Sequence, residues 1–270
     1  MVRAKKHLGQ NFLWHKGTLK KIRDELDPVG NDILVEIGPG MGALTEELVH
    51  FPEKLICIEK DPDMIAILSE KFKTFIEQGK MEILERDVLE FDFSILKEYG
   101  LSYKIAGNIP YYITGAIIRH ALEADPLPEK IVFLIQKEVA DRAVARDGKE
   151  SLLSLSIKAF GTPRSRGKVP AKFFKPAPKV DSAVLVIDSP SRKHFQNKDH
   201  EELFFEIIRH AFMHKRKTAL KNLSGYLFSP DIRTWWKNEG LDERVRAEDI
   251  HVDTWLRLAT WVYNGTHDAK

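Results

Sequence analysis

The chain has 270 residues, of which 43% are hydrophobic and 30% charged, and this composition is typical of a folded protein with one or two domains. No apolar run approaches the roughly 20 residues that cross a bilayer, and the basic N-terminus lacks the apolar core of a secretory signal, so we expect a cytoplasmic protein without membrane contact. The single cysteine, Cys57, excludes an intramolecular disulfide and a cysteine-based zinc cluster, and we expect no metal site.

The net charge of only +2 conceals an uneven distribution of charge along the chain. Seven Lys or Arg and no acid lie between Lys158 and Lys179, five more lie between Arg209 and Lys221, and no acid precedes Asp24. Clustered basic residues are typical of a surface that binds nucleic acid. Three separately solvated stretches on different faces would give the same pattern, so charge alone leaves both interpretations open.

Between residues 30 and 136, short apolar runs alternate with amphipathic stretches. The apolar runs predict buried strands at residues 32–38, 54–59, 80–87, 103–108 and 130–136. The stretches between them predict helices at residues 43–51, 63–77 and 113–124. Strands that alternate with helices build a parallel sheet covered on both faces, so the fold class is α/β and Rossmann-like.

The remaining residues are predicted to complete this domain and to add a small helical one. Further helices are expected at residues 17–26, 137–146 and 152–160, and a last strand at residues 182–188. Residues 189–200 are polar and turn-rich, which indicates a linker. Beyond it, helical stretches are expected at residues 201–212, 215–228, 230–240 and 252–264. We therefore expect an α/β domain over residues 1–190 and an all-α domain over residues 198–270.

The segment VEIGPGMGAL joins a predicted strand to the next helix. Its glycines Gly38, Gly40 and Gly42 let the backbone approach a ligand closely, and their G-x-G-x-G spacing differs from the dinucleotide fingerprint G-x-G-x-x-G. Glu59 and Asp87 end the next two strands, where acids can accept hydrogen bonds from a ribose and from an adenine amino group. Glycine-rich turns are common, but these three features share one edge of the sheet. They indicate a nucleoside-containing cofactor, and S-adenosylmethionine fits that description.

The segment GNIPYYITG ends the fourth strand at the same edge. Asn108 offers a side-chain carbonyl, Pro110 fixes the direction of the Ile109 carbonyl, and Tyr111 offers a ring face. Two acceptors and a flat ring suit a planar base with an exocyclic amine, whose lone pair they would free to attack an electrophilic methyl group. The alternative is an ordinary turn with a buried tyrosine, and the position behind this strand favours the site. Tyr112 is expected in the core or on the rim.

Together these motifs resemble the ribosomal RNA adenine dimethyltransferases, specifically the KsgA/Dim-type small-subunit enzymes. The resemblance covers nearly the whole chain through HLGQNFL, EIGPGMGALT, GNIPYYIT, FFKPAPKVDSAV, RHAFMHKRKTALKNL and VRAEDIHVDTWLRLA. It implies a class I methyltransferase domain with a mostly parallel seven-stranded sheet. It also implies two methyl transfers from S-adenosylmethionine to each of two adjacent adenosines near the 3′ end of small-subunit rRNA.

The resemblance further implies the residues of the site. It places Asn108, Ile109, Pro110 and Tyr111 around the target amine, with Phe174 as a second aromatic contact. It implies that the cofactor is bound by Gln10, Asn11, Leu13, Gly38, Gly40, Glu59, Asp87, Val88 and Asn108. From the residues alone, the stretch at 10–12 would equally suit a cap of the helix that follows it.

Basic residues are the candidate RNA contacts, namely Arg164, Arg166, Lys168, Lys215, Arg216, Lys217 and Lys221. An apolar period through Phe212, Leu220 and Leu223 predicts that residues 215–217 lie together on the outside of a helix, which suits phosphate contacts as well as a merely solvated face. The tryptophans at residues 235–261 are expected to be helical core rather than base-stacking groups. We expect a monomer that acts on small-subunit rRNA within an assembling subunit.

Three alternatives to this function differ in substrate or in class. A large-subunit rRNA methyltransferase of the antibiotic-resistance type shares the catalytic domain, but the basic HKRKTALKNL element favours the small-subunit type. An inactive RNA-binding assembly or transcription factor on the same fold has no chemical need for Glu59, Asp87 and NIPY together. A DNA adenine methyltransferase is disfavoured because no base-reading module is evident.

Overall fold

The computed structural model describes residues 5, 8–99, 102–227 and 232–267. The chain forms two compact units. The first contains residues 1–141 and 161–190, and the second contains residues 142–160 and 191–270. The second unit thus includes residues 142–160, which the division of the sequence had assigned to the first domain. No described helix is long and apolar enough to cross a membrane.

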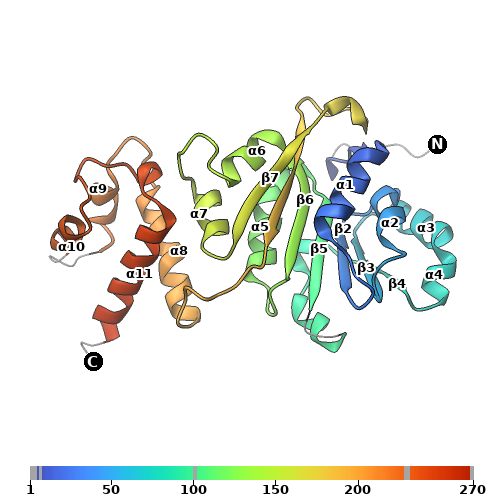
Figure 1. Cartoon of the computed structure of the whole chain (residues 1–270), viewed down its shortest axis with the longest axis horizontal. Helices are drawn as coiled ribbons and strands as arrows, with labels where there is room; N and C mark the ends of the chain where they lie inside the picture. The colour runs from blue at the N-terminus through green and yellow to red at the C-terminus, as the bar shows by residue number, and fades with distance from the viewer. Residues whose placement is uncertain (1–4, 6–7, 100–101, 228–231, 268–270) are drawn as a thin grey trace. The chain divides into compact units, whose positions relative to one another are not determined.

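The first unit is built around a seven-stranded sheet with the order β4-β3-β2-β5-β6-β9-β7 (Figure 1). Its strands are β2 (Ile33–Ile37), β3 (Lys54–Glu59), β4 (Met81–Glu85), β5 (Tyr103–Asn108), β6 (Lys130–Gln136), β7 (Thr162–Val169) and β9 (Ser182–Asp188). The first five run parallel to their neighbours, whereas β9 pairs antiparallel with both β6 and β7. All five strands predicted before residue 137 are therefore confirmed, as is the strand at 182–188.

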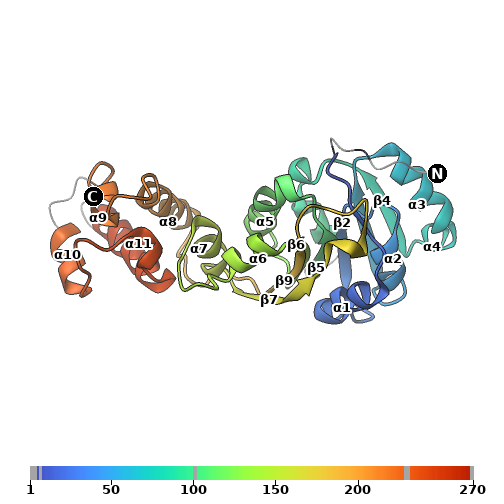
Figure 2. The same ribbon diagram turned by 90° about the horizontal axis from the view of Figure 1, so that it is seen from above.

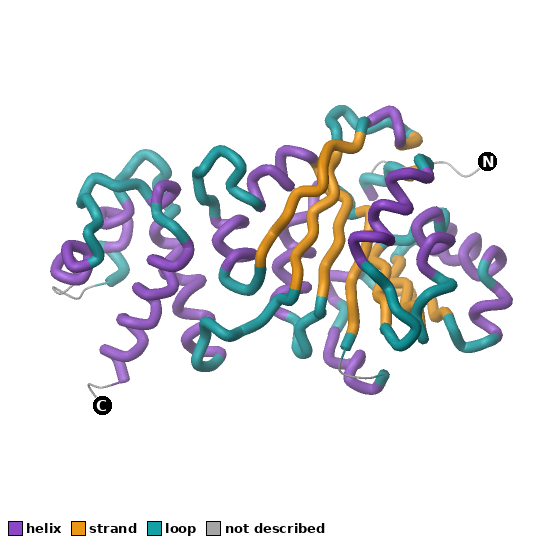
Figure 3. The backbone as a smooth tube through the Cα atoms, in the orientation of Figure 1, coloured by secondary structure: helices purple, strands orange, loops and turns teal. Residues whose placement is uncertain are grey.

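Helices cover both faces of this sheet, and α1 and α5 lie on opposite faces (Figures 2 and 3). The helices before β7 are α1 (Lys16–Leu26), α2 (Ala43–Leu48), α3 (Pro62–Lys71), α4 (Lys73–Glu77), α5 (Thr114–Glu123), α6 (Lys137–Ala143) and α7 (Leu152–Lys158). The single helix predicted over residues 63–77 is wrong, because Phe72, with φ −109° and ψ 19°, separates α3 from α4. Phe72 packs in the core there, so the chain bends where burying this ring requires it.

Two features of the first unit have no counterpart among the predicted elements. The basic stretch after residue 158 contains the edge strand β7, whose residues are mostly half-exposed and therefore give no apolar run. A separate two-stranded sheet joins β1 (Phe12–Leu13) to β8 (Phe174–Lys175). This pairing brings together segments more than 150 residues apart, which local pattern cannot predict.

The second unit is helical, with α7 joined by α8 (Lys198–Ala211), α9 (Ala219–Leu223), α10 (Ile232–Asn238) and α11 (Val252–His267). Its core is aromatic: Phe204, Trp236 and Trp255 are each at most 1% exposed, so the expected core role of the tryptophans is confirmed for these two. The predicted helix at 215–228 is wrong in its first part, because only α9 is helical there and residues 215–217 form a turn. The residues from 228 to 231 lie outside the described part of the chain.

Candidate active site

The carboxyl ends of four neighbouring parallel strands bring the predicted site residues to one edge of the sheet. In the order β4-β3-β2-β5, these strands lead into Asp87, Glu59, the glycine loop after Ile37, and Asn108. Ligands of such sheets bind beyond the carboxyl ends of the strands. The arrangement expected from the sequence is therefore present at the level of topology.

The glycine loop uses the backbone freedom of its glycines. Gly38, Gly40 and Gly42 have φ values of 63°, 56° and 75°, which other residues rarely adopt. A Cβ atom on Gly40 would lie 3.0 Å from the Phe12 ring, whereas the space beside Gly38 is open. The loop can therefore let a ligand approach its backbone at Gly38, while Phe12 closes it at Gly40.

Glu59 ends β3 as a buried carboxylate, 8% exposed, that organises the surrounding backbone. Its Oε2 accepts a hydrogen bond from the Gly40 N–H at 3.1 Å, and its Oε1 accepts from the N–H groups of Lys60 and Asp61 at 2.9 and 3.0 Å. Burial raises the pKa of this carboxyl above its ordinary value, although these three hydrogen bonds oppose the rise. Because each carboxylate oxygen has two acceptor sites, Glu59 keeps the capacity to accept from a ligand hydroxyl.

Asp87 and Val88 lie after the end of β4. Asp87 accepts a hydrogen bond from the Leu89 N–H at 3.1 Å, and it forms an ion pair with Lys60 Nζ at 3.1 Å. Desolvation alone would raise the pKa of Asp87, but these hydrogen bonds lower it overall. Asp87 is therefore an ionised acceptor at the rim of the site, and Val88 is a buried apolar wall beside it.

The motif after β5 is held from three sides. Gly107 admits no side chain, because a Cβ atom there would lie 2.6 Å from the Ile37 carbonyl oxygen. Asn108 Nδ2 donates to the Asn11 carbonyl at 2.8 Å. Since a carbonyl can only accept, this contact fixes the orientation of the amide and leaves Oδ1 as the free acceptor end. The Ile109 N–H donates to the Leu134 carbonyl at 3.0 Å, which ties the backbone at Ile109 to β6.

Pro110 and the two tyrosines continue this motif. Pro110 has φ −57° and ψ 130°, the extended conformation expected of a proline that turns the chain. The Tyr111 hydroxyl and Ser182 Oγ lie 2.6 Å apart, so the half-buried ring is held at its tip. Burial raises the pKa of Tyr111 above its ordinary value, at which the hydroxyl is already neutral near pH 7. Tyr112 is 59% exposed and therefore lies on the rim.

The N-terminal segment crosses this edge and contacts both halves of the site. Gln10 Nε2 donates to Asp61 Oδ2 at 2.8 Å, and Lys5 Nζ pairs with Asp61 Oδ1 at 2.6 Å. The Gln10 side chain therefore helps to hold the N-terminal segment against Asp61. The suggestion that residues 10–12 cap the following helix is wrong, because the His15 side chain caps α1 by accepting from the Thr18 N–H. Asn11, through Asn108, links this segment to the proposed catalytic motif.

Three predicted site residues are less accessible than their roles require. Ile109 is 1% exposed as a whole residue, so its carbonyl would have to become more exposed to accept a hydrogen bond from a target amine. Leu13 and Phe174 face each other across the β1–β8 pair, are 5% and 3% exposed, and pack in the apolar core. A contact of Leu13 with the cofactor and a contact of Phe174 with a base remain predictions. For Phe174 the ring would have to become more exposed than it is in this structure.

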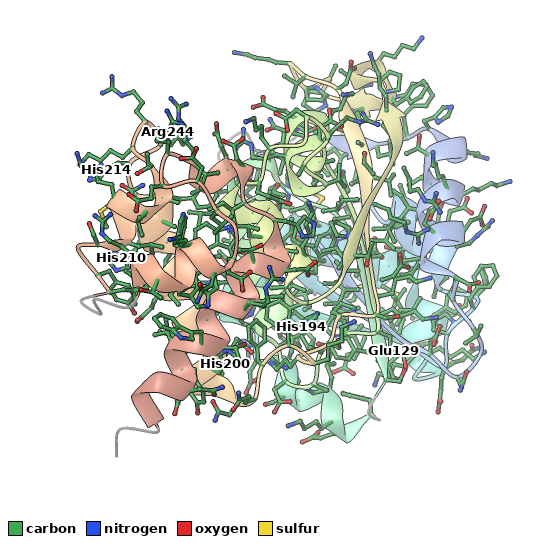
Figure 4. The ribbon with its side chains drawn as sticks, turned by 60° about the vertical axis from the view of Figure 1, so that its left-hand side comes forward. Glu129, His194, His200, His210, His214 and Arg244 are labelled. Atoms are coloured by element: carbon green, nitrogen blue, oxygen red, sulfur yellow. The ribbon has the colours of Figure 1, made fainter. Side chains whose placement is uncertain are left out.

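The predicted RNA contacts fall into two groups with different environments. Arg164, Arg166 and Lys168 on β7 each form an ion pair, with Asp188, Glu25 and Asp181 respectively. Their charge is therefore partly neutralised, which weakens the case for phosphate contacts there. Lys215, Arg216, Lys217 and Lys221 are exposed in the helical unit. Figure 4 shows the neighbouring His214, with Arg244, at the edge of that unit.

The structure adds residues that the sequence did not single out. Asp61, 1% exposed, anchors the N-terminal segment, and Ser182, fully buried, holds Tyr111. Asp61 carried a local signal, since it precedes Pro62 and caps α3 by accepting from the Asp63 N–H. No local signal marks Ser182, whose partner lies 71 residues away.

Comparisons with known proteins show which family and fold this chain resembles. Residues 1–264 match the family described as ribosomal RNA adenine dimethylase. The chain is 37% identical, over 95% of its length and 88% of the relative, to the ribosomal RNA small subunit methyltransferase A of Dehalococcoides mccartyi (strain CBDB1). Its fold is similar to that of a dimethyladenosine transferase from Plasmodium falciparum, with a TM-score of 0.74, 24% identity, and coverage of 94% of this chain and 98% of that one. It is also similar to the fold of the 23S rRNA methyltransferase ErmE, with a TM-score of 0.73, 24% identity, and coverage of 93% and 98%.

Proposed function

Since this chain belongs to the ribosomal RNA adenine dimethylase family, we propose that it methylates the exocyclic amino groups of two adjacent adenosines near the 3′ end of small-subunit rRNA. The enzyme is a small-subunit rRNA adenine dimethyltransferase. The observation that carries the mechanism is the hydrogen bond from Asn108 Nδ2 to the Asn11 carbonyl at 2.8 Å. It leaves Asn108 Oδ1 as an acceptor at the edge of the sheet where the glycine loop and Glu59 lie.

The residues at this edge fit S-adenosylmethionine as the methyl donor. Glu59 would accept a hydrogen bond from a ribose hydroxyl, and Asp87 would accept one from the adenine amino group, with Val88 against the ring. The open space beside Gly38 suits a close approach of the ligand to the backbone. When bound, the cofactor supplies an electrophilic methyl group on a sulfonium.

The chain's own residues prepare the target amine for attack. Asn108 Oδ1 and the Ile109 carbonyl accept the two amine hydrogens, which favours a tetrahedral nitrogen whose lone pair is free. Tyr111 stacks on the extruded base, and this stacking offsets part of the free energy lost when the base leaves its RNA stack. No strongly basic group is needed, because the amine proton becomes acidic only as the new bond forms. Positioning and preorganised acceptors therefore carry most of the rate.

The exposed basic residues of the helical unit support an RNA partner. Lys215, Arg216, Lys217 and Lys221 suit contacts to phosphates, which position RNA without reading its sequence. The enzyme acts as a monomer on an assembling small subunit, and therefore in the cytoplasm where such subunits form. The relative named a small-subunit enzyme is 37% identical, whereas the likeness to ErmE concerns the fold.

The test uses tritiated S-adenosylmethionine with undermethylated small subunits and, in parallel, large subunits. The labelled nucleosides are identified after digestion, and dimethyladenosine from the small subunit alone is expected. Label in the large subunit would favour the resistance-type function. Cofactor binding without label on either subunit would favour a binding factor.

Two variants test the mechanism in the same assay. Asn108→Ala should abolish transfer while the thermal midpoint of the protein stays close to that of the unmodified chain. Asn238→Ala, which changes an exposed asparagine at the end of α10, serves as the matched control and should transfer normally. Normal transfer by the Asn108 variant would refute the role given to its side-chain carbonyl.

A further inference from the structure

Trp14 is a large aromatic side chain left open to solvent beside the proposed active site. It is 58% exposed. It is the only tryptophan outside residues 235–261, where the other four lie. A single exposed apolar residue needs no explanation, so an inference depends on what holds Trp14 and on what surrounds it.

The backbone and the neighbouring rings hold Trp14 in place. The backbone N–H of Trp14 donates to the Phe173 carbonyl at 3.1 Å and so extends the β1–β8 pairing by one bond. The Phe173 ring stacks on His15 with 3.7 Å between centroids and 3° between planes. Trp14 meets the edges of both rings, at 6.1 Å from Phe173 and 6.4 Å from His15.

His15 is itself fixed, so this aromatic cluster does not rest on a mobile ring. Its Nδ1 lies 3.1 Å from the Thr18 backbone nitrogen and 2.9 Å from Thr18 Oγ1, as the cap of α1. We call Trp14, His15 and Phe173 the aromatic platform. Its ring positions are set by secondary structure, which lowers the entropy lost when a flat ligand stacks on it.

The two segments that build the aromatic platform are rich in basic residues. Six exposed lysines lie on these segments, namely Lys16, Lys20, Lys21, Lys172, Lys175 and Lys179. None of the six forms an ion pair with a carboxylate among the described residues. Neither residues 12–23 nor residues 171–180 contain an acid. Lysines without carboxylate partners on the segments that carry the exposed Trp14 ring match a ligand that combines phosphates with planar rings, which is single-stranded nucleic acid.

The aromatic platform is close to the proposed catalytic motif. Trp14 follows Asn11 by three residues, so their Cα atoms lie at most about 11 Å apart. The Asn11 carbonyl is the acceptor that orients Asn108. On the other segment, Phe173 directly precedes Phe174. A nucleotide next to an adenosine held at Asn108 would therefore emerge near Trp14.

We propose that Trp14, supported by Phe173 and His15, stacks on the base of the nucleotide that flanks the target adenosine. The inference rests on the proposed function, since it assumes an RNA base extruded at Asn108. Extrusion leaves the flanking base without one stacking partner, and the indole replaces that partner. If the two methylated adenosines are adjacent, the base on Trp14 is the other adenosine, which is thereby held close to the site before its own methylation.

The kinetic test compares substitutions of Trp14 with a matched exposed aromatic. Trp14→Ala should raise the KM for undermethylated small subunits by about tenfold, whereas Trp14→Phe, which keeps a ring, should raise it by about threefold or less. Phe51→Ala is the control, because Phe51 is 42% exposed and precedes β3 at the opposite edge of the sheet. It should leave the KM unchanged.

The binding test uses fluorescence, since Trp14 is the one tryptophan of its unit. The emission of the unmodified protein minus that of Trp14→Ala isolates the Trp14 signal, and a single-stranded hexamer of adenosines should quench it. Quenching that is absent, together with an unchanged KM, would overturn the proposal.

The two tests distinguish this proposal from a protein contact at Trp14 and from a failure of the proposed function. If Trp14→Ala raises the KM for intact subunits but not for deproteinised rRNA, and no quenching occurs, Trp14 contacts a protein and the RNA proposal fails. If the unmodified enzyme transfers no methyl group to either subunit, the proposed function fails, and the quenching experiment alone decides whether the aromatic platform stacks on bases.

Discussion

The hydrogen bond between Tyr111 and Ser182 should hold the ring on which, in the proposed mechanism, the target base stacks. The two hydroxyl oxygens lie 2.6 Å apart, and Ser182 is fully buried at the start of β9. A tyrosine hydroxyl is neutral near pH 7 at its ordinary pKa, and burial raises the pKa of Tyr111 further, so the bond persists across the neutral pH range. Removing either hydroxyl should free the ring to turn away from the base.

The magnitude follows from the burial of each partner. Ser182→Ala leaves the hydroxyl of a half-buried ring without its partner, and because water can partly replace it we expect a loss of about 1 kcal/mol in the free energy of unfolding. Tyr111→Phe leaves the fully buried Ser182 hydroxyl unsatisfied, which should cost about 2 kcal/mol. The double variant should lose about 1 kcal/mol less than the sum, because it removes both ends of one bond.

Two measurements on the four proteins decide the matter. Urea unfolding gives the stability cycle, and single-turnover methylation of undermethylated small subunits gives the kinetic one. We expect the single-turnover rate constant to fall in each single variant, and Tyr111→Phe to have little further effect once Ser182 is alanine. Strictly additive losses in both measurements would refute a coupling between this bond and the position of the ring.

Four further predictions concern other parts of the molecule. Burial raises the pKa of Glu36 to about 7, so the folded state holds this proton more tightly than the unfolded state does. The free energy of unfolding should fall by up to about 3 kcal/mol as the pH rises from about 4.5 to 7, and Glu36→Gln should remove that fall in urea titrations. Gly107→Ala should yield no stable protein in a thermal scan, because its Cβ would lie 2.6 Å from the Ile37 carbonyl oxygen. Gly115→Ala, on open helix surface, should instead stabilise by about 0.5 to 1 kcal/mol. Alanine at all three basic positions 215–217 should weaken RNA binding and flatten the dependence of log K on log salt by about 2 to 3; an unchanged slope would count against this patch.

The order of elements in the first unit could be predicted because each element carries its own pattern. Buried parallel strands are continuous apolar runs, as in β3 and β6, and the helices between them show one apolar face. Residues at the ends of such strands share one edge of the sheet by topology. For this reason Glu59, Asp87 and Asn108 could be assigned to one site before any distance was known.

Local pattern failed where burial or pairing depends on distant residues. The break between α3 and α4 at Phe72 comes from the packing of one ring. In the edge strand β7, apolar and polar residues alternate too weakly for the strand to be recognised. Residues 215–217 were assigned to a helix by apolar spacing, yet the turn between α8 and α9 decides their position. None of these outcomes is encoded within a few residues of where it occurs.

The sequence by itself determined the family and the residue types at the strand ends, because the glycine spacing, the acids and the NIPY motif can be read along the chain. The tertiary structure decided how those residues are held. The amide of Asn108 is oriented by the Asn11 carbonyl, 97 residues away, and the Tyr111 ring is fixed by Ser182, 71 residues away. It also left Trp14 exposed on a fixed backbone and buried Phe174. Such contacts join segments that only the completed fold brings together, so no periodicity along the chain can predict them.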